Sequence, residues 1–188
     1  ICGQYALALG SYRRQRVDAL CGCHDYRARK YPETPFHQHA SGRLELHFSA
    51  IAAWCDGAGV RLISDEIYHG LNYDSPITTA ASLGSSAVVV NSFSKYFSMT
   101  GWRVGWLILP DDLVRPVERL AQNLFISAPH ISQVAAEAAF DCHAELAENV
   151  ARYRRSRDHL LRALPEVGFD HLSPAEGAFY LFADITRR

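Results

Sequence analysis

The sequence predicts an α/β protein in which helices cover a layered sheet. Short apolar, β-branched runs have the length and composition of buried strands. Segments with apolar residues every three or four positions lie between and after them, as in amphipathic helices. This alternation of strands and helices is typical of an α/β sheet. Ligands in such sheets bind beyond the carboxyl ends of strands, so residues just after each strand are candidates for a functional site.

The elements follow from these two patterns. Strands are expected at residues 60–64, 87–91, 104–109 and 177–183. Helices are expected at residues 49–56, from Asp111 up to the break at Pro129, at 131–140 and at 144–164. The last helix carries four arginines opposite its apolar stripe, and we interpret them as a solvent-exposed face: Arg152, Arg154, Arg155 and Arg157.

Residues 1–48 follow neither pattern. Prolines and histidines interrupt them, and only residues 12–20 have the spacing of a short helix. We therefore expect an irregular or non-native-like segment before residue 49. Cys21, Cys23 and His24, with His37 and His39, raise the alternative of a zinc site. Two cysteines separated by one residue do not match the common ligand spacings, and a metal site is not the favoured interpretation.

Composition excludes several classes of function. Hydrophobic residues make up 48% of the 188 residues, charged residues make up 21%, and the formal net charge is −1. These values are ordinary for a globular protein and give no global attraction to nucleic acid or to anionic membranes. No apolar run reaches the roughly 18 residues of a membrane-spanning helix. Five cysteines at irregular spacing favour a reducing, cytoplasmic location over a disulfide framework.

Two of the expected strands are followed by residues that can carry chemistry. Lys95 follows the strand at 87–91, and a partly desolvated lysine has a lowered pKa and becomes nucleophilic. Asp65 and Tyr68 follow the strand at 60–64, and their spacing lets them reach different edges of one flat ring. Each residue alone has an ordinary interpretation, as a surface lysine, a helix-capping carboxylate or a packed tyrosine.

The segment around Lys95 also contains donors suited to a phosphate group. Ser92 and Ser94 supply hydroxyl groups, and Arg103 supplies a guanidinium fork between flanking glycines. Alone, Arg103 is typical of a structural or surface arginine. The ordered combination of these residues is more specific than any one of them.

Together the motifs resemble class I/II aminotransferases of the pyridoxal-phosphate (PLP) fold type I. The resemblance is carried by Ser64-Asp-Glu-Ile-Tyr68 and by the run from Asn91-Ser-Phe-Ser-Lys95 to Gly101-Trp-Arg-Val-Gly-Trp106, and extends more loosely from Ile51 to the C-terminus. It implies part of the large domain, with a mostly parallel sheet and helices on both faces, then a long helix and the start of a small C-terminal domain. The expected division is an irregular segment at 1–48, a PLP-binding core at 49–142, and the interdomain helix with the small domain at 143–188.

The resemblance also implies a chemistry. Lys95 would form a Schiff base with pyridoxal 5'-phosphate, and an amino group would pass between an amino acid and a 2-oxo acid. Asp65 would hold the pyridinium and Tyr68 the ring oxygen, while Ser92 and Arg103, with Ser94 as a weaker candidate, would bind the phosphate. Such enzymes are usually homodimers. Neither nucleic acid nor a membrane is an expected partner.

The sequence departs from the family pattern at both ends. Residues 1–48 lack the family's phosphate loop, its ring-stacking aromatic and its Asn-Pro-x-Gly segment, and no arginine near the C-terminus can be assigned to the substrate carboxylate. We therefore expect a truncated or partly mistranslated product with half a cofactor site and no complete substrate site, so that this fragment can be inactive. Alternatives are carbon–sulfur lyase or decarboxylase chemistry on the same fold, or a non-catalytic PLP-type domain that serves as a sensing or interaction module.

Overall fold

The computed structural model describes residues 42–74, 76–84 and 86–185, with side chains from residue 48 onward. The expected helix at 12–20 and the candidate zinc ligands lie outside these ranges. The elements follow in the order α2 (Gly42–Gly57), β1 (Ile63–Asp65), η1 (Ala80–Ser82), β2 (Val88–Ser92), η2 (Thr100–Trp102), β3 (Gly105–Ile108), α3 (Asp111–Leu124), α4 (His130–Ala139) and α5 (His143–Glu166). No helix in this part of the chain has the combined length and apolar character needed to cross a bilayer.

The three described strands form one sheet in the order β1-β2-β3. β1 and β2 run parallel, with Asp65 opposite Val90, and β3 runs antiparallel to β2, with Gly105 opposite Ser92. The three strands therefore form a mixed sheet, with one parallel and one antiparallel pair, within the expected α/β fold. Residues 93–104 join β2 to β3 and contain only the short 3-10 helix η2, whereas the crossover between parallel strands is usually an α-helix.

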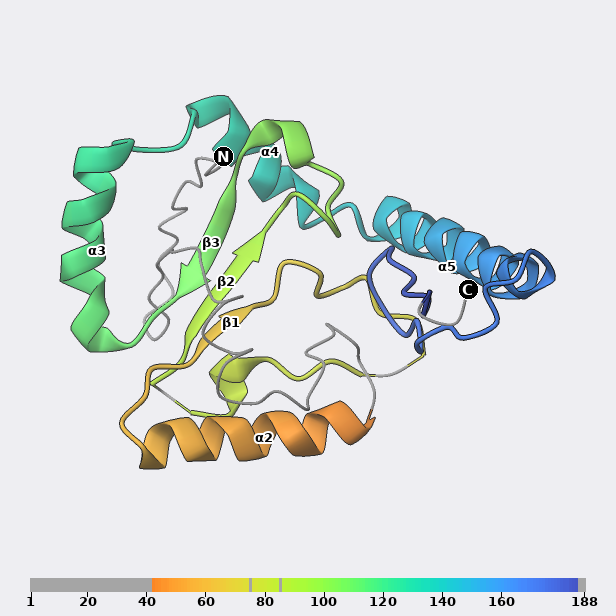
Figure 1. Cartoon of the computed structure of the whole chain (residues 1–188). Helices are drawn as coiled ribbons and strands as arrows, with labels where there is room; N and C mark the ends of the chain where they lie inside the picture. Colours follow the sequence, from red (N-terminus) through yellow and green to blue (C-terminus); the bar gives the residue numbers. More distant parts are fainter. Residues whose placement is uncertain (1–41, 75, 85, 186–188) are drawn as a thin grey trace.

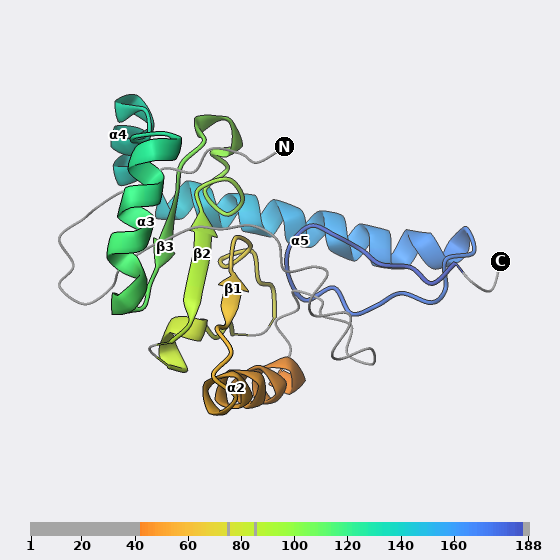
Figure 2. The same cartoon turned by 60° about the vertical axis from the view of Figure 1, so that its left-hand side comes forward.

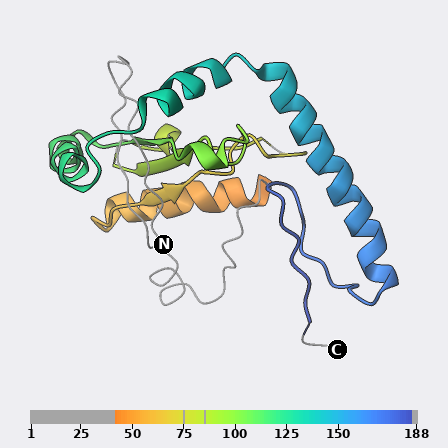
Figure 3. The ribbon, with the colours of Figure 1, turned by 90° about the horizontal axis from the view of Figure 1, so that it is seen from above.

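The helices lie around this sheet as the fold class requires. Figure 3 shows α2 on one side of the strands and α4 on the other, and α3 lies beside the edge of the sheet, next to β3 in Figure 1. The long helix α5 extends away from the sheet, and the chain after it turns back toward the strands (Figure 2). The helix α2 begins at Gly42, seven residues before the helix expected from residue 49.

Two apolar clusters hold the layers together. The first joins Ala52 and Cys55 of α2 to Leu62, Ala80 and Val89. The second lies at the far end of β2, where the side chains of Phe93, Met99, Val104 and Ala136 are buried together. This second cluster encloses the start and the end of the 93–104 connection, and it fixes that connection at the sheet edge.

The strand expected at 177–183 is not formed. This segment contributes only two isolated bridges, Asn72 with Gly177 and Leu172 with Ala183. The backbone of Ala178 has a φ of 56°, in the left-handed region, which interrupts the extended conformation that a strand requires. The apolar pattern is therefore a wrong sign of a buried strand, since Phe179, Tyr180 and Phe182 remain exposed.

Candidate active site at the carboxyl edge of the sheet

The sheet topology brings the sequence-predicted residues to one edge. The parallel strands β1 and β2 both end there, at Asp65 and Ser92. The antiparallel strand β3 starts at the same edge, opposite Ser92. Lys95 and Arg103 lie near the two ends of the connection between β2 and β3 and so occupy this edge as well.

Hydrogen bonds hold that connection in a compact shape. The Oγ atoms of Ser92 and Ser94 are 2.9 Å apart, and the Ser94 amide donates to Ser92 Oγ at 3.0 Å. Thr100 Oγ1 donates to the Ser94 carbonyl at 2.6 Å, and Arg103 Nη1 donates to the Thr100 carbonyl at 2.8 Å. A chain of contacts therefore joins Arg103 to the two serines through Thr100.

Two residues of the connection adopt left-handed backbone conformations. Ser98 has a φ of 57° and Arg103 a φ of 54°. Non-glycine residues visit this region at a cost and keep it only where their surroundings enforce it, often at functional sites. The backbone around Lys95 is thus set by its context and not by local preference.

Aromatic rings surround the amine of Lys95. Its Nζ lies 5.5 Å from the centroid of the Tyr68 ring and 5.4 Å from that of Phe179. Both distances are within the range of a cation–π interaction. Tyr68 in turn meets Phe179 and Tyr180 edge-on, with ring centroids 5.4 Å apart in each pair. The structure therefore brings Lys95 and Tyr68 together, as the motif predicted.

Phe179 and Tyr180 were not among the predicted site residues. Their only signal in the sequence was membership of an apolar run, which we interpreted as a strand. Tyr180 shares a short hydrogen bond with the hydroxyl of Tyr68, across 112 positions of sequence. Such a contact depends on the path of the chain after α5, which local pattern does not specify.

The phenol of Tyr68 is held in its protonated form. Burial raises the pKa of Tyr68 well above its usual range, and the hydrogen bond with Tyr180 and the charge of Asp65 act in the same direction. A protonated phenol can donate a hydrogen bond to an oxygen near Lys95. This is the role that the motif assigns to Tyr68.

Asp65 and Glu66 face opposite sides of the chain after β1. Asp65 is exposed and its Oδ1 accepts from the Ile67 amide at 3.2 Å. Glu66 is 4% exposed, and its Oε1 accepts from Ser64 Oγ at 3.1 Å and from the Ala80 amide at 2.7 Å. Glu66 was not singled out in the sequence. Its buried carboxylate fixes the segment that carries Asp65 and Tyr68.

The histidine that contacts Glu66 leads to a pH-dependent stability. His69 Nδ1 lies 3.2 Å from Glu66 Oε2. Burial lowers the pKa of His69 from its ordinary value of 6.5, although the carboxylates of Glu66 and Asp65 act in the opposite direction. The unfolded chain therefore binds more protons than the folded chain as the pH falls below 6.5, and the free energy of unfolding decreases with it.

We expect His69→Asn to weaken this loss of stability on acidification. The measurement is urea unfolding of wild type and variant at about pH 7.5 and about pH 5.5, on either side of the ordinary histidine pKa. His171→Asn is the matched control, since the His171 side chain is 50% exposed. An unchanged pH dependence in His69→Asn would show that another group causes the loss.

A cavity of about 240 Å³ lies beside the aromatic cluster. Phe179 and Tyr180 line it, together with residues of α5 and of the segment around Ala178. Asp65, Lys95 and Arg103 are not among its lining residues. Phe179 therefore lies between the two features, since it lines the cavity and its ring lies 5.4 Å from the Lys95 amine.

The donor set at the edge fits the chemical groups of PLP. Lys95 offers an amine for an aldehyde, Asp65 an exposed carboxylate for a pyridinium, and Tyr68 a protonated phenol for a ring oxygen. Ser92, Ser94 and Arg103 supply donors for a phosphate, and they already form one hydrogen-bonded connection.

The fold and this edge define a class of protein: an α/β domain with a lysine beside a tyrosine, and an aspartate at the same edge, at the carboxyl ends of its strands. The chain belongs to the family described as aminotransferase class I and II, which matches residues 46–188. Its fold is that of the PLP fold type I aminotransferases, as the sequence predicted.

Two of the similar proteins are aminotransferases whose names give different substrates. The chain is 50% identical over 142 residues to valine–pyruvate aminotransferase of Mycobacterium tuberculosis, a match that covers 73% of this chain and 37% of that protein. It is 39% identical over 129 residues to (5-formylfuran-3-yl)methyl phosphate transaminase of Methanocaldococcus jannaschii, covering 66% of this chain and 35% of that protein. The chain therefore spans little more than a third of the length of either relative.

Solved structures give the same fold. An aminotransferase from Mycobacterium tuberculosis superposes with a TM-score of 0.72 at 49% identity, over 74% of this chain and 37% of that one. A variant of Thermus thermophilus aspartate aminotransferase superposes with a TM-score of 0.70 at 29% identity, over 74% of this chain and 39% of that one. These matches support an amino-group-transferring enzyme and give no support to the alternative of a non-catalytic module.

Proposed function

We propose that this protein transfers an amino group between an amino acid and a 2-oxo acid, with PLP as cofactor and Lys95 as the residue that binds it. The observation that carries the proposal is the position of the Lys95 amine. It lies at the carboxyl edge of the sheet, 5.5 Å from the Tyr68 ring and 5.4 Å from the Phe179 ring, within the segment that matches the family.

Each residue at the edge has a proposed part in holding the cofactor. Asp65 pairs with the pyridine nitrogen, and Tyr68 donates its phenolic proton to the ring oxygen. Arg103, Ser92 and Ser94 bind the phosphate through their N–H and O–H groups. When bound, PLP supplies an electron sink for the charge that develops on the substrate α-carbon.

Lys95 has a second proposed role as the group that moves a proton at the substrate α-carbon. Such a role requires an amine that can lose and regain its proton near neutral pH. The rings of Tyr68 and Phe179 lie within cation–π range of this amine and hold it at the edge of the sheet. These aromatic contacts support the proposed position of the Lys95 amine.

The names of the relatives suggest the first substrates to assay. Valine and pyruvate, named for the Mycobacterium tuberculosis relative, are the first amino acid and 2-oxo acid to assay. We propose a homodimer in the cytoplasm. We also propose that residues 49–142 form the PLP-binding core and that residues 143–188 form the interdomain helix and the start of a small domain.

Borohydride reduction in the presence of PLP tests the central residue. The chain contains two lysines, Lys30 and Lys95, so a reduced pyridoxyl adduct can form on either of two side chains. We expect peptide mass spectrometry to place the adduct on Lys95, and we expect Lys30→Arg to leave the yield unchanged. An adduct that appears only on Lys30, or no adduct at all, contradicts the proposal.

A further inference from the structure

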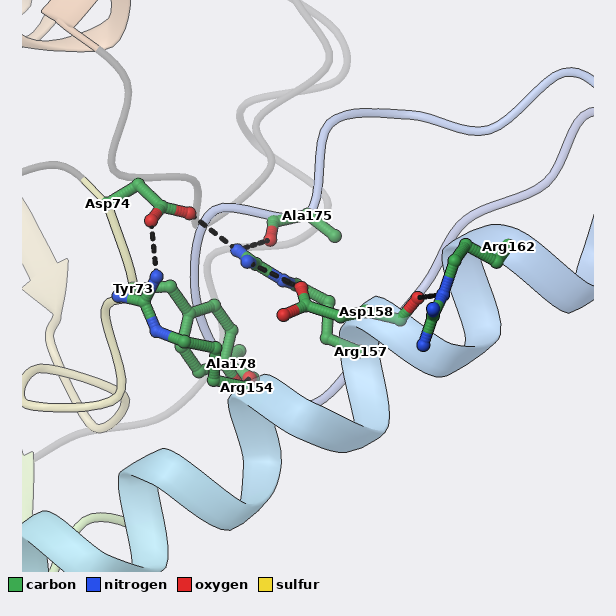
Figure 4. Close-up of polar contacts among 8 residues, drawn as sticks. All are labelled: Tyr73, Asp74, Arg154, Arg157, Asp158, Arg162, Ala175 and Ala178. Carbon is green, nitrogen blue, oxygen red and sulfur yellow. Dashed lines mark hydrogen bonds and ion pairs between the residues drawn. The ribbon is translucent and has the colours of Figure 1, made fainter.

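Arg157 of α5 joins three separate parts of the chain (Figure 4). Its Nη1 lies 2.7 Å from Asp74 Oδ2 and donates to the Ala175 carbonyl at 3.2 Å, and its Nε donates to Asp158 Oδ1 at 2.8 Å. Its guanidinium carbon lies 4.7 Å from the centroid of the Tyr73 ring. The Arg157 side chain is 14% exposed, so the interpretation of these arginines as a solvated helix face is wrong for this residue.

A second arginine supports the same contact. Arg154 lies one helical turn before Arg157 and pairs with the other carboxylate oxygen of Asp74. The hydrogen bonds from Arg157 and Arg154 lower the pKa of Asp74 below its usual range. Because Asp74 is 52% exposed, solvent screens these pairs, and we assign most of the constraint to the more buried contacts of Arg157.

The segments that Arg157 joins also pair with each other. The Tyr73 amide donates to the Glu176 carbonyl at 2.9 Å, and the Ala178 amide donates to the Leu71 carbonyl at 2.7 Å. The Tyr73 hydroxyl donates to the Ala178 carbonyl. A Cβ at Gly177 would lie 3.0 Å from the Leu71 carbonyl oxygen, so the two backbones approach as closely as a glycine permits.

This paired segment leads directly to the site. After the left-handed turn at Ala178, the next two side chains are Phe179 and Tyr180. Their rings contact Tyr68, and the Phe179 ring faces the Lys95 amine. Residues 71–74 are also connected to the site, since they follow Tyr68 in the chain by only a few positions.

We infer that Arg157 is a positioning residue for Lys95: by fixing residues 175–178 on residues 71–74, it holds the Phe179 and Tyr180 rings against Lys95 and Tyr68. The planar guanidinium is suited to this work because it presents donors in several directions and stacks on Tyr73 at the same time. The catalytic meaning of the inference rests on the proposed function, whereas the positioning of the amine can be measured without cofactor.

The rate at which an amine-reactive acylating reagent labels Lys95 reports how well the rings cover it. The experiment uses the whole chain without PLP, a lysine-containing peptide as internal standard, and mass spectrometry of the Lys95 peptide. We expect Arg157→Gln to raise the Lys95 labelling rate at least about threefold, because the covering segment opens locally. The same variant should lose hydrogen-exchange protection at the Ala178 amide.

Two variants make the comparison specific. Arg155→Gln removes an exposed arginine of the same helix and should leave both readouts unchanged. Arg157→Lys keeps the charge without the planar fork and should give an intermediate labelling rate. Hydrogen-exchange protection of Val89, which is 1% exposed in β2, shows in each variant that the core remains folded.

The outcomes separate the inference from the proposed function. If Arg157→Gln and Arg155→Gln label Lys95 at the same rate while Val89 stays protected, the inference is wrong. Should Arg157→Gln lose protection at Val89, Arg157→Lys decides instead, since it keeps the positive charge at this position: faster labelling with Val89 protected supports the inference, and an unchanged rate overturns it. If labelling changes as expected but Lys95 takes up no PLP, the inference stands and the proposed function falls.

Discussion

Lys95→Ala is expected to abolish amino-group transfer in a hybrid enzyme that carries this chain's residues. In the hybrid, residues 46–188 replace the matching part of valine–pyruvate aminotransferase of Mycobacterium tuberculosis, to which the chain is 50% identical over 142 residues. Lys95 is proposed both to attach the cofactor and to move the substrate proton. Loss of a positioned acid–base group alone lowers kcat by about 10²- to 10⁴-fold, and we expect at least this fall.

The measurement is conversion of pyruvate to alanine with valine as amino donor, followed together with the imine absorbance. The unsubstituted hybrid is the reference, and Arg155→Gln is the matched control because Arg155 is exposed on α5. Persistence of the absorbance and turnover in Lys95→Ala would assign the chemistry to another amine. A folded hybrid that binds PLP without producing alanine from valine would instead point to a different substrate or a different PLP reaction, such as elimination or decarboxylation.

Phe93→Ala is expected to give the largest loss of stability among single core substitutions in the described chain. Phe93 is 2% exposed, and its ring centroid lies 4.7 Å from that of Phe97 and 5.0 Å from that of Trp106. Deleting a buried aromatic side chain removes its apolar burial and leaves a cavity, which together cost about 3–5 kcal/mol. The position is critical because Phe93 lies between Ser92 and Ser94 and anchors the connection that carries Lys95.

Denaturant unfolding of the variant measures this effect as a lower midpoint at unchanged slope. Leu124→Ala is the control, since Leu124 is 63% exposed and its truncation should change stability by about 0.5 kcal/mol or less. Phe93→Leu restores most of the volume and should cost less than about 2 kcal/mol. A Phe93→Ala variant as stable as Leu124→Ala would mean that the aromatic cluster does not support the core.

Sequence reasoning succeeded where the signal is local. The apolar run at 87–91 corresponds to β2, at Val88–Ser92, and the three- or four-residue spacing after Asp111 and after Pro129 corresponds to α3 and α4. The side-chain period of a strand or a helix can be seen in consecutive residues, so these elements can be predicted without information about the rest of the chain. The motif around Lys95 was recognisable for the same reason, because its members lie within a dozen positions.

Contacts between segments far apart in the sequence cannot be predicted from local patterns. The pairing of Asp74 with Arg154 and Arg157 spans 80 and 83 positions, and the helix that carries the arginines gave only the pattern of a solvated face. Glu66 differs from an exposed carboxylate only through partners such as Ala80. Whether a charged side chain is buried depends on the groups that the fold places opposite it, and neither composition nor hydrophobic periodicity contains this information.

The sequence by itself determined the α/β class, the order of the elements, and the set of side chains available at the strand ends, since these follow from short-range periodicity and from motif residues close together in the chain. Tertiary structure alone decided the antiparallel course of β3, the presence of Phe179 beside Lys95 and of Tyr180 beside Tyr68, and the contacts of Arg157. The physical reason is that strand direction and ring contacts depend on which distant segments of the chain the fold brings next to each other. Which segments meet depends in turn on packing over the whole fold.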